Sequence, residues 1–172
     1  DPADGRYTLP PEHAVALTDQ ESPAYLPGFF QVAVGSVLDS PRITEASRTG
    51  AGVGWHEHNH EVFDGCERFF RTGYNANLLG SWLPALDGVV EKLERGAKVA
   101  DVGCGHGAST ILMAQAFPKS TFVGSDYHEG SIRNGRRIPA GFSPQHITLS
   151  IHRRIVAHDS FARPQYPGNA GD

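Results

Sequence analysis

The 172-residue chain has little cysteine and no long apolar run, and each shortage excludes a class of protein. Its only two cysteines, Cys66 and Cys104, are too few for a disulfide framework, which favours a reducing, cytoplasmic location. No stretch approaches the roughly 18 to 20 apolar residues that span a bilayer, and residues 1–10 lack the basic start and apolar run of a secretory signal. The sequence therefore predicts neither a membrane protein nor a disulfide-rich secreted one.

Positive charge is also scarce. The chain has 15 Lys and Arg against 19 Asp and Glu, a net charge of −4 and a pI of about 6.1. Such a chain has no overall field that attracts phosphate backbones or anionic lipids, so neither nucleic acid nor membrane is an expected partner. The length and the 39% apolar content are typical of a globular protein with one domain, or one domain plus a fragment of a second.

The charge changes abruptly after Ile132. Residues 133–172 hold six Arg, no Lys, no Glu and two Asp, a net +4 that leaves −8 for residues 1–132. Within this segment Ile147, Leu149 and Ile151 alternate as in an edge strand. We interpret 133–172 as an atypical basic tail. It is either an unrelated extension, such as one from an altered reading frame, or a genuine disordered segment.

Short elements are predicted before the Gly-rich stretch 48–54, which we interpret as a linker. Residues 6–9 are strand-like, 10–17 form a short helix, and Ser22-Pro23 starts a second helix. From 28 to 38 the apolar residues follow a helical period, and Asp39-Ser40-Pro41 ends that helix. We expect the apolar face of this helix to pack against another element; its residues are Phe30, Ala33, Val34, Val37 and Leu38.

A βαβ unit over residues 98–126 is the clearest structural signal. An apolar helical stripe over 86–93 leads through Gly96 into a strand at 98–102. A Gly-rich turn and a helix over 108–117, stopped by Pro118, then lead to a strand that ends at Ser125-Asp126. Because a strand, crossover helix and parallel strand make such a unit, the sequence predicts an α/β domain with its ligand crevice at the carboxyl ends of the strands.

Three alternating glycines and two acids point to a ligand at that crevice. Gly103, Gly105 and Gly107 suit a tight turn with positive φ values and let a ligand approach the backbone. Free N–H groups at the start of the following helix can hold an anionic group. Asp101 can favour a cationic ligand group, and Asp126, 25 residues later, can accept hydrogen bonds from ribose hydroxyls. The pattern indicates a nucleotide-type ligand.

The pattern Asp101-x-Gly103-x-Gly105-x-Gly107 with Asp126 resembles the first two motifs of class I S-adenosylmethionine-dependent methyltransferases. With the upstream segments 54–58 (GWHEH), 69–74 (FFRTGY) and 83–88 (LPALDG), the chain is similar to a bacterial group of these enzymes that carries an N-terminal winged-helix segment. The resemblance covers roughly residues 5–132. It implies a Rossmann-like methyltransferase fold, reduced to its first βαβ unit and preceded by a mainly helical segment, in a chain truncated at both ends.

The resemblance also divides the chain and assigns roles. Residues 1–52 would be the remnant of a winged-helix or dimerisation domain, 53–132 the N-terminal half of the SAM-binding domain, and 133–172 the tail. The implied cofactor is S-adenosyl-L-methionine. Asp126 would bind the ribose hydroxyls of the cofactor, and Tyr127 would lie beside its adenine. Tyr74 would close over the cofactor. The implied cofactor-binding residues are Asp101, Gly103, Gly105, Gly107, Asp126, Tyr127 and Tyr74.

The implied function is methyl transfer to an unidentified small-molecule acceptor. No catalytic residue is named, because in the resembled class these come mainly from later strands, and only 46 residues follow Asp126. The resemblance allows a homodimer through the N-terminal segment. Two alternatives stay open: Gly103-x-Gly105-x-x-Ala108 with Asp126 also fits an NAD(P)-dependent Rossmann oxidoreductase, and the N-terminal segment fits a non-catalytic regulatory or dimerisation module.

Other chemically suggestive residues have ordinary structural interpretations. His56, His58 and His60 would share one face of a strand, as metal ligands do, but only the first and last align on a helix. The resemblance implies no metal here, so we predict a solvated polar segment. Cys104 lies near a helix N-terminus, which can lower a thiol pKa, but we interpret it as a small packed thiol. The aromatic stripe is expected to pack a helix on the sheet; it comprises Phe69, Phe70, Tyr74 and Trp82.

Overall fold

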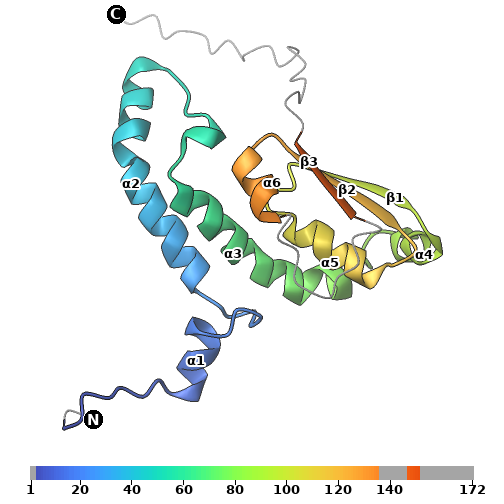
Figure 1. The fold of residues 1–172 in the computed structure, drawn as a ribbon, viewed down its shortest axis with the longest axis horizontal. Coiled ribbons are helices and arrows are strands. Elements are labelled where there is room, and N and C mark those ends of the chain that lie inside the picture. The colour runs from blue at the N-terminus through green and yellow to red at the C-terminus, as the bar shows by residue number, and fades with distance from the viewer. Residues whose placement is uncertain (1–2, 136–146, 152–172) are drawn as a thin grey trace, which may run out of the picture.

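The structure is a computed structural model that describes residues 3–135 and 147–151. It combines helices with a small parallel sheet, as in an incomplete α/β fold (Figure 1). The elements in chain order are α1 (Pro11–Leu17), α2 (Pro27–Thr49), the 3-10 turn η1 (Trp55–Glu57), α3 (His60–Asn77), the π-helical turn η2 (Leu78–Trp82), α4 (Val89–Arg95), β1 (Lys98–Val102), α5 (Ala108–Ala116), β2 (Thr121–Asp126), α6 (Glu129–Gly135) and β3 (Ile147–Ile151). None of the helices in these two ranges is both long and apolar enough to cross a membrane.

The predicted βαβ unit is confirmed. β1 and β2 are adjacent and parallel, with Lys98 opposite Thr121, and α5 connects them. Glycine in a left-handed conformation begins α5 at Gly107, and Pro118 follows its last turn. β3 pairs in parallel with the other edge of β2, so the strand order is β1-β2-β3. The carboxyl ends of all three strands therefore lie at the same edge of the sheet.

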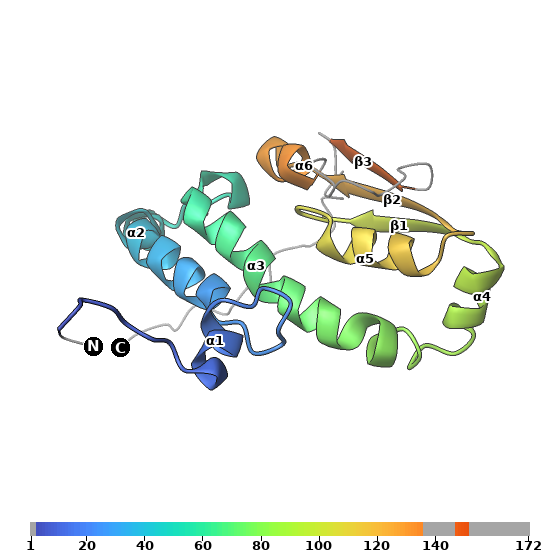
Figure 2. The same cartoon turned by 60° about the horizontal axis from the view of Figure 1, so that its bottom comes forward.

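Only one face of the sheet is covered by the described residues. Phe122 and Ile132 are fully buried on the covered face, and α5 lies between the sheet and the C-terminal half of α3 (Figure 2). Since side chains alternate along a strand, the neighbouring positions point to the other face. There Val102 is 67% and Val123 39% exposed. A parallel sheet normally has both faces covered, so this one is only half enclosed.

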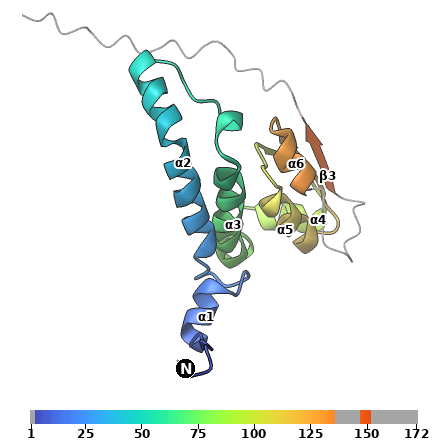
Figure 3. The ribbon, with the colours of Figure 1, turned by 60° about the vertical axis from the view of Figure 1, so that its left-hand side comes forward.

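α2 and α3 form an antiparallel pair on the far side of α5, and glycines bring their backbones close together (Figure 3). A Cβ added at Gly35 would lie 2.7 Å from the backbone nitrogen of Val62, and one added at Gly65 would lie 2.6 Å from that of Val32. The buried Asp39 carboxylate accepts the backbone N–H of Asn59 at the start of α3. The two helices therefore contact each other through faces that carry small and polar residues.

Two predictions for α2 are wrong. The helix does not end at residues 39–41 but continues through Pro41 to Thr49, where Gly50 adopts a φ of 72°. Pro41 and Val37 both lie on the exposed side, so the carbonyl that loses its helical partner at Val37 faces water. The apolar face expected to be buried is exposed, because the glycines and Asp39 occupy the contact with α3.

Near the N-terminus, α1 is confirmed over Pro11–Leu17 and two other predictions are wrong. Residues 6–9 form no strand, since no neighbouring strand pairs with them and Tyr7 is almost fully exposed. Ser22-Pro23 starts a turn instead of a helix, because the Ser22 hydroxyl accepts the N–H of Ala24, two residues on. The next helix, α2, begins at Pro27.

Regular structure continues past the change in composition at Ile132. α6 spans Glu129–Gly135 and therefore crosses it. The alternating residues Ile147, Leu149 and Ile151 lie in β3, at an edge of the sheet as their pattern indicates. Leu149 belongs to the same buried cluster as Phe122. The remainder of the predicted tail, 136–146 and 152–172, lies outside the described residues.

Candidate functional site

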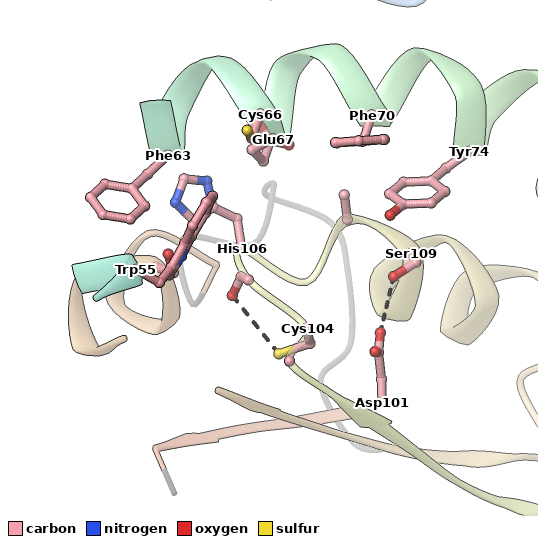
Figure 4. A pocket seen from close by; sticks show the side chains of 14 residues that line it. Trp55, Phe63, Cys66, Glu67, Phe70, Tyr74, Asp101, Cys104, His106 and Ser109 are labelled. Atoms are coloured by element: carbon pink, nitrogen blue, oxygen red, sulfur yellow. Dashed lines mark hydrogen bonds between the residues drawn. The ribbon is translucent and has the colours of Figure 1, made fainter. Parts of the chain in front are cut away.

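A cavity of about 250 Å³ separates α3 from the glycine turn that follows β1 (Figure 4). One face of α3 forms its roof, where Phe63, Cys66, Phe70 and Tyr74 follow helical spacing. Its floor is the segment from Asp101 at the end of β1 to the first turn of α5. The volume lies just below the range of typical small-molecule sites, about 300 to 1,000 Å³.

Glycine is required at the turn by the backbone conformation. Gly103, Gly105 and Gly107 have φ values of 78°, 56° and 79°, which L side chains rarely adopt. A Cβ added at Gly103 or Gly105 would meet no atom within 4 Å, so the backbone there is open to a ligand. At Gly107 an added Cβ would lie 3.1 Å from Leu149 in β3, so this third glycine also allows packing against the sheet.

Asp101 places a partly engaged carboxylate on the cavity floor. Its Oδ2 accepts hydrogen bonds from the Ser109 hydroxyl at 3.0 Å and the Thr110 hydroxyl at 2.5 Å, both from α5. No described residue donates to its Oδ1. The two hydroxyls fix the orientation of the carboxylate and leave one oxygen for a ligand.

Tyr74 lies above Asp101 in the roof of the cavity, as Figure 4 shows. Its ring stacks on Phe70 at a centroid distance of 6.5 Å and makes a T-shaped contact with Trp82 at a centroid distance of 6.1 Å. Burial, and secondarily the charge of Asp101, raise the pKa of the Tyr74 hydroxyl. The Tyr74 hydroxyl therefore stays protonated at neutral pH and can donate a hydrogen bond from an aromatic wall of the cavity.

The structure brings together four of the seven predicted cofactor-binding residues in the cavity lining: Asp101, Gly103, Gly105 and Tyr74. Asp126 lies next to the turn instead. It is buried, and its two oxygens accept the N–H of Gly105 and the N–H of His128, each at 2.8 Å. Tyr127 is exposed, and its ring makes a T-shaped contact with the His56 ring. In this arrangement Asp126 holds the shape of the turn, and ribose binding by Asp126 stays a prediction.

His106 is a site residue that the sequence analysis missed. It occupies the turn between Gly105 and Gly107 and lines both this cavity and a polar cavity of about 430 Å³ between α3 and α5. Burial lowers the pKa of the His106 imidazole despite the acids nearby, Glu67 and Asp64. Its Nε2 is 4.0 Å from Asp64 Oδ1, and its ring makes no hydrogen bond with any residue that the structure describes. Its position between two glycines was the available signal.

Cys104 and the histidine run have structural roles. Burial, with the charges of Asp101 and Asp126, raises the pKa of Cys104 to about 12, so its thiol stays protonated.

His58 Nδ1 lies 2.7 Å from the Asp39 carboxylate. The segment that contains His58 is a 3-10 turn followed by extended backbone, not a strand. Within residues 3–135 and 147–151, no group of three or more His, Cys, Asp or Glu side chains is arranged to hold a metal ion.

Comparison with protein-family models and with curated proteins finds no match to this chain. The functional proposal therefore depends on the residue pattern and on the geometry of the cavity.

Proposed function

We propose that this chain carries the N-terminal part of an S-adenosylmethionine-dependent methyltransferase domain of Rossmann-like fold, and that the cavity beneath α3 binds this cofactor. One observation carries the proposal. The fixed Asp101 carboxylate, with one oxygen that accepts from no described residue, lies beside the open backbone of Gly103 and Gly105 and beneath the aromatic face of α3. A ligand with a cationic centre and a flat ring system complements such a cavity.

The donors and surfaces of the cavity fit S-adenosylmethionine. The carboxylate of Asp101 attracts its positive charge, and the absence of Cβ atoms at Gly103 and Gly105 lets its body lie against the turn. Phe70 and Tyr74 offer ring faces to a cation or a flat base. When bound, the cofactor supplies a methyl group on a sulfonium sulfur. Asp126 contributes by keeping the N–H of Gly105 in place, and its remaining lone pairs are suited to ribose hydroxyls.

In this proposal the protein is a transferase that methylates a small-molecule acceptor in the cytoplasm. The polar cavity between α3 and α5 is the candidate acceptor site, because it adjoins the first cavity, with which it shares the lining residues His106, Glu67 and Ala108. The protein contributes to catalysis by bringing the two reactants close together in the correct orientation.

Calorimetric titration of the 172-residue chain with S-adenosylhomocysteine and, separately, with NAD⁺ tests the proposal. We expect S-adenosylhomocysteine to bind and NAD⁺ to give no heat. Asp101→Asn should weaken S-adenosylhomocysteine binding by about tenfold or more, because it removes the charge that attracts the ammonium group of this ligand, whose sulfur is neutral, while keeping an acceptor for the Ser109 and Thr110 hydroxyls. Asp87→Asn is the matched control, since Asp87 is exposed and lies outside the cavity. Binding of NAD⁺ alone would favour the oxidoreductase alternative, and binding of neither ligand would refute the proposal.

A further inference from the structure

The two ends of the cavity beneath α3 differ in chemistry. At one end lie the Asp101 carboxylate and, above it, the Tyr74 ring (Figure 4). Trp55, from the turn η1, lies at the opposite end of the same cavity, and 42% of its surface is exposed. Trp55 is absent from the implied cofactor-binding residues, although it is the largest aromatic side chain of the cavity lining. Its place in the lining therefore needs its own explanation.

The Trp55 end of the cavity adjoins the loop that follows Asp126, the predicted ribose ligand. The Trp55 ring makes a T-shaped contact with Phe63 at a centroid distance of 5.2 Å. Phe63 in turn stacks on His128 at a centroid distance of 4.3 Å, and the Asp126 carboxylate accepts the backbone N–H of His128. A ligand that extends along the cavity from Asp101 toward Asp126 therefore has Trp55 beside its far end.

The turn that carries Trp55 is held in place on both sides. Before it, the N–H of Gly54 donates to the Glu57 carboxylate at 2.5 Å. After it, His58 Nδ1 lies 2.7 Å from the buried Asp39 carboxylate of α2. A rigid aromatic side chain on a fixed backbone loses little conformational entropy when a ligand packs against it. Trp55 is therefore a preorganised binding surface.

An indole ring at this position suits the flat base of a nucleoside. Stacking requires only two flat faces, and every nucleobase has such a face. The other end of the cavity carries the Asp101 carboxylate, which attracts a cationic group. The two ends thus match the two parts of S-adenosylmethionine, a charged amino-acid part and an adenosine part.

We propose that Trp55 stacks on the adenine of this cofactor, which lies along the cavity with its adenosine part at the Trp55 end and its amino-acid part at the Asp101 end. The inference rests on the proposed function, because it assigns a direction to the ligand that the cavity is proposed to bind. Trp55 is then a binding residue that acts by stacking, so a smaller aromatic ring at the same position retains part of the contact.

Fluorescence of single-tryptophan variants tests the proposal, because Trp55 and Trp82 are the only tryptophans of the chain. Trp82→Phe leaves Trp55 as the only indole, whereas Trp55→Phe leaves Trp82, which does not line the cavity. S-adenosylhomocysteine should quench the emission of the first variant and not that of the second. Adenosine, which lacks the amino-acid part, should also quench only the first variant.

Calorimetric titration of the 172-residue chain with S-adenosylhomocysteine gives the matching affinities. Trp55→Ala should raise the Kd by about tenfold, and Trp55→Phe by no more than about threefold, because phenylalanine keeps a ring face. Phe30→Ala is the matched control. Phe30 is an exposed aromatic residue outside the cavity lining, so its removal should leave the Kd unchanged.

The outcomes separate this inference from the proposed function. A wild-type chain that binds S-adenosylhomocysteine without quenching of Trp55, and with the same Kd in folded Trp55→Ala, would overturn the stacking role and leave the proposed function intact. A wild-type chain that does not bind this ligand would overturn both. Circular dichroism controls for folding, and the quenching in Trp82→Phe, which keeps Trp55, decides the matter if Trp55→Ala loses its helical signal.

Discussion

Cys104 shows how the environment of a residue can cancel a local effect. Its place near the N-terminus of α5 can lower a thiol pKa, and the sequence analysis weighed that effect. In the structure, burial is the largest influence, and the carboxylates of Asp101 and Asp126 act in the same direction. The pKa of Cys104 is therefore raised to about 12, and burial also raises the pKa of Cys66.

This shift predicts slow alkylation of the folded protein. At pH 8 iodoacetamide should modify Cys104 about a thousandfold more slowly in the native chain than in urea. The reason is that raising the pKa from 9.0 to about 12 lowers the fraction of reactive thiolate by about that factor. The native rate should keep rising about tenfold per pH unit up to pH 10, whereas the unfolded rate levels off near pH 9. Mass spectrometry of quenched samples measures both rates. Equal rates at pH 8 in the two states would contradict the shift.

The residues of the cavity floor could be predicted from the sequence, but the hydrogen bond between Asp126 and the glycine turn could not. Asp101, Gly103 and Gly105 belong to one short turn, so their proximity follows from local chain geometry. Asp126 is also at the correct end of its strand, but its hydrogen bond to Gly105 depends on how β2 lies next to β1. His106 was missed because only its fold neighbours on α3 and α5 make it part of two cavities.

Elements with strong local signals were predicted close to their observed bounds, whereas α2 was not. α1, β1, α5 and β2 have proline, glycine or a short β-branched run at their ends. In α2 the apolar period indicates a buried face, but the close approach of Gly35 and Gly65 to the partner backbones decides which face meets α3. A stripe of small residues is a weaker sequence signal than a stripe of large apolar ones. The helical period was real, but the apolar face that it marks is exposed among the residues that the structure describes.

The α2–α3 contact predicts opposite effects for two glycines of the same helix. Gly65→Ala should destabilise the protein by about 1–3 kcal/mol, since its Cβ would lie 2.6 Å from a backbone atom of α2, which cannot yield easily. Gly73→Ala should stabilise it by about 0.5–1 kcal/mol, since the nearest atom is Trp82 at 3.9 Å and alanine is the better helix former. Urea denaturation gives both free energies of unfolding. Equal and favourable effects would show that the two backbones are not in close contact.

At the scale of the whole molecule, the structure is built in layers, and the described residues leave two surfaces uncovered. α2, α3, α5 and the sheet follow one another, and the buried core lies between α5, α6 and one face of the sheet (Figures 1 and 3). The other sheet face and the apolar face of α2 that includes Phe30, Val34 and Val37 are exposed. The change in composition at Ile132 predicted a boundary there, but α6 crosses it and β3 adds Leu149 to the core. Composition describes the average of a segment and carries no information on which of its residues reach the core.

The uneven covering of the sheet predicts that neighbouring residues of β2 differ sharply in their contribution to stability. Phe122→Ala should cost about 3–5 kcal/mol, because Phe122 is fully buried and its removal leaves a cavity in the apolar cluster that covers the sheet. Val123→Thr should change the free energy of unfolding by no more than about 0.5 kcal/mol, because Val123 is on the uncovered face and threonine keeps the branched Cβ that strands favour. Phe122→Leu, which should lose less than Phe122→Ala, keeps the comparison measurable if the alanine variant does not fold. Urea denaturation followed by circular dichroism gives all three values. A large cost at Val123 would mean that another part of the chain, or a second chain, covers that face of the sheet.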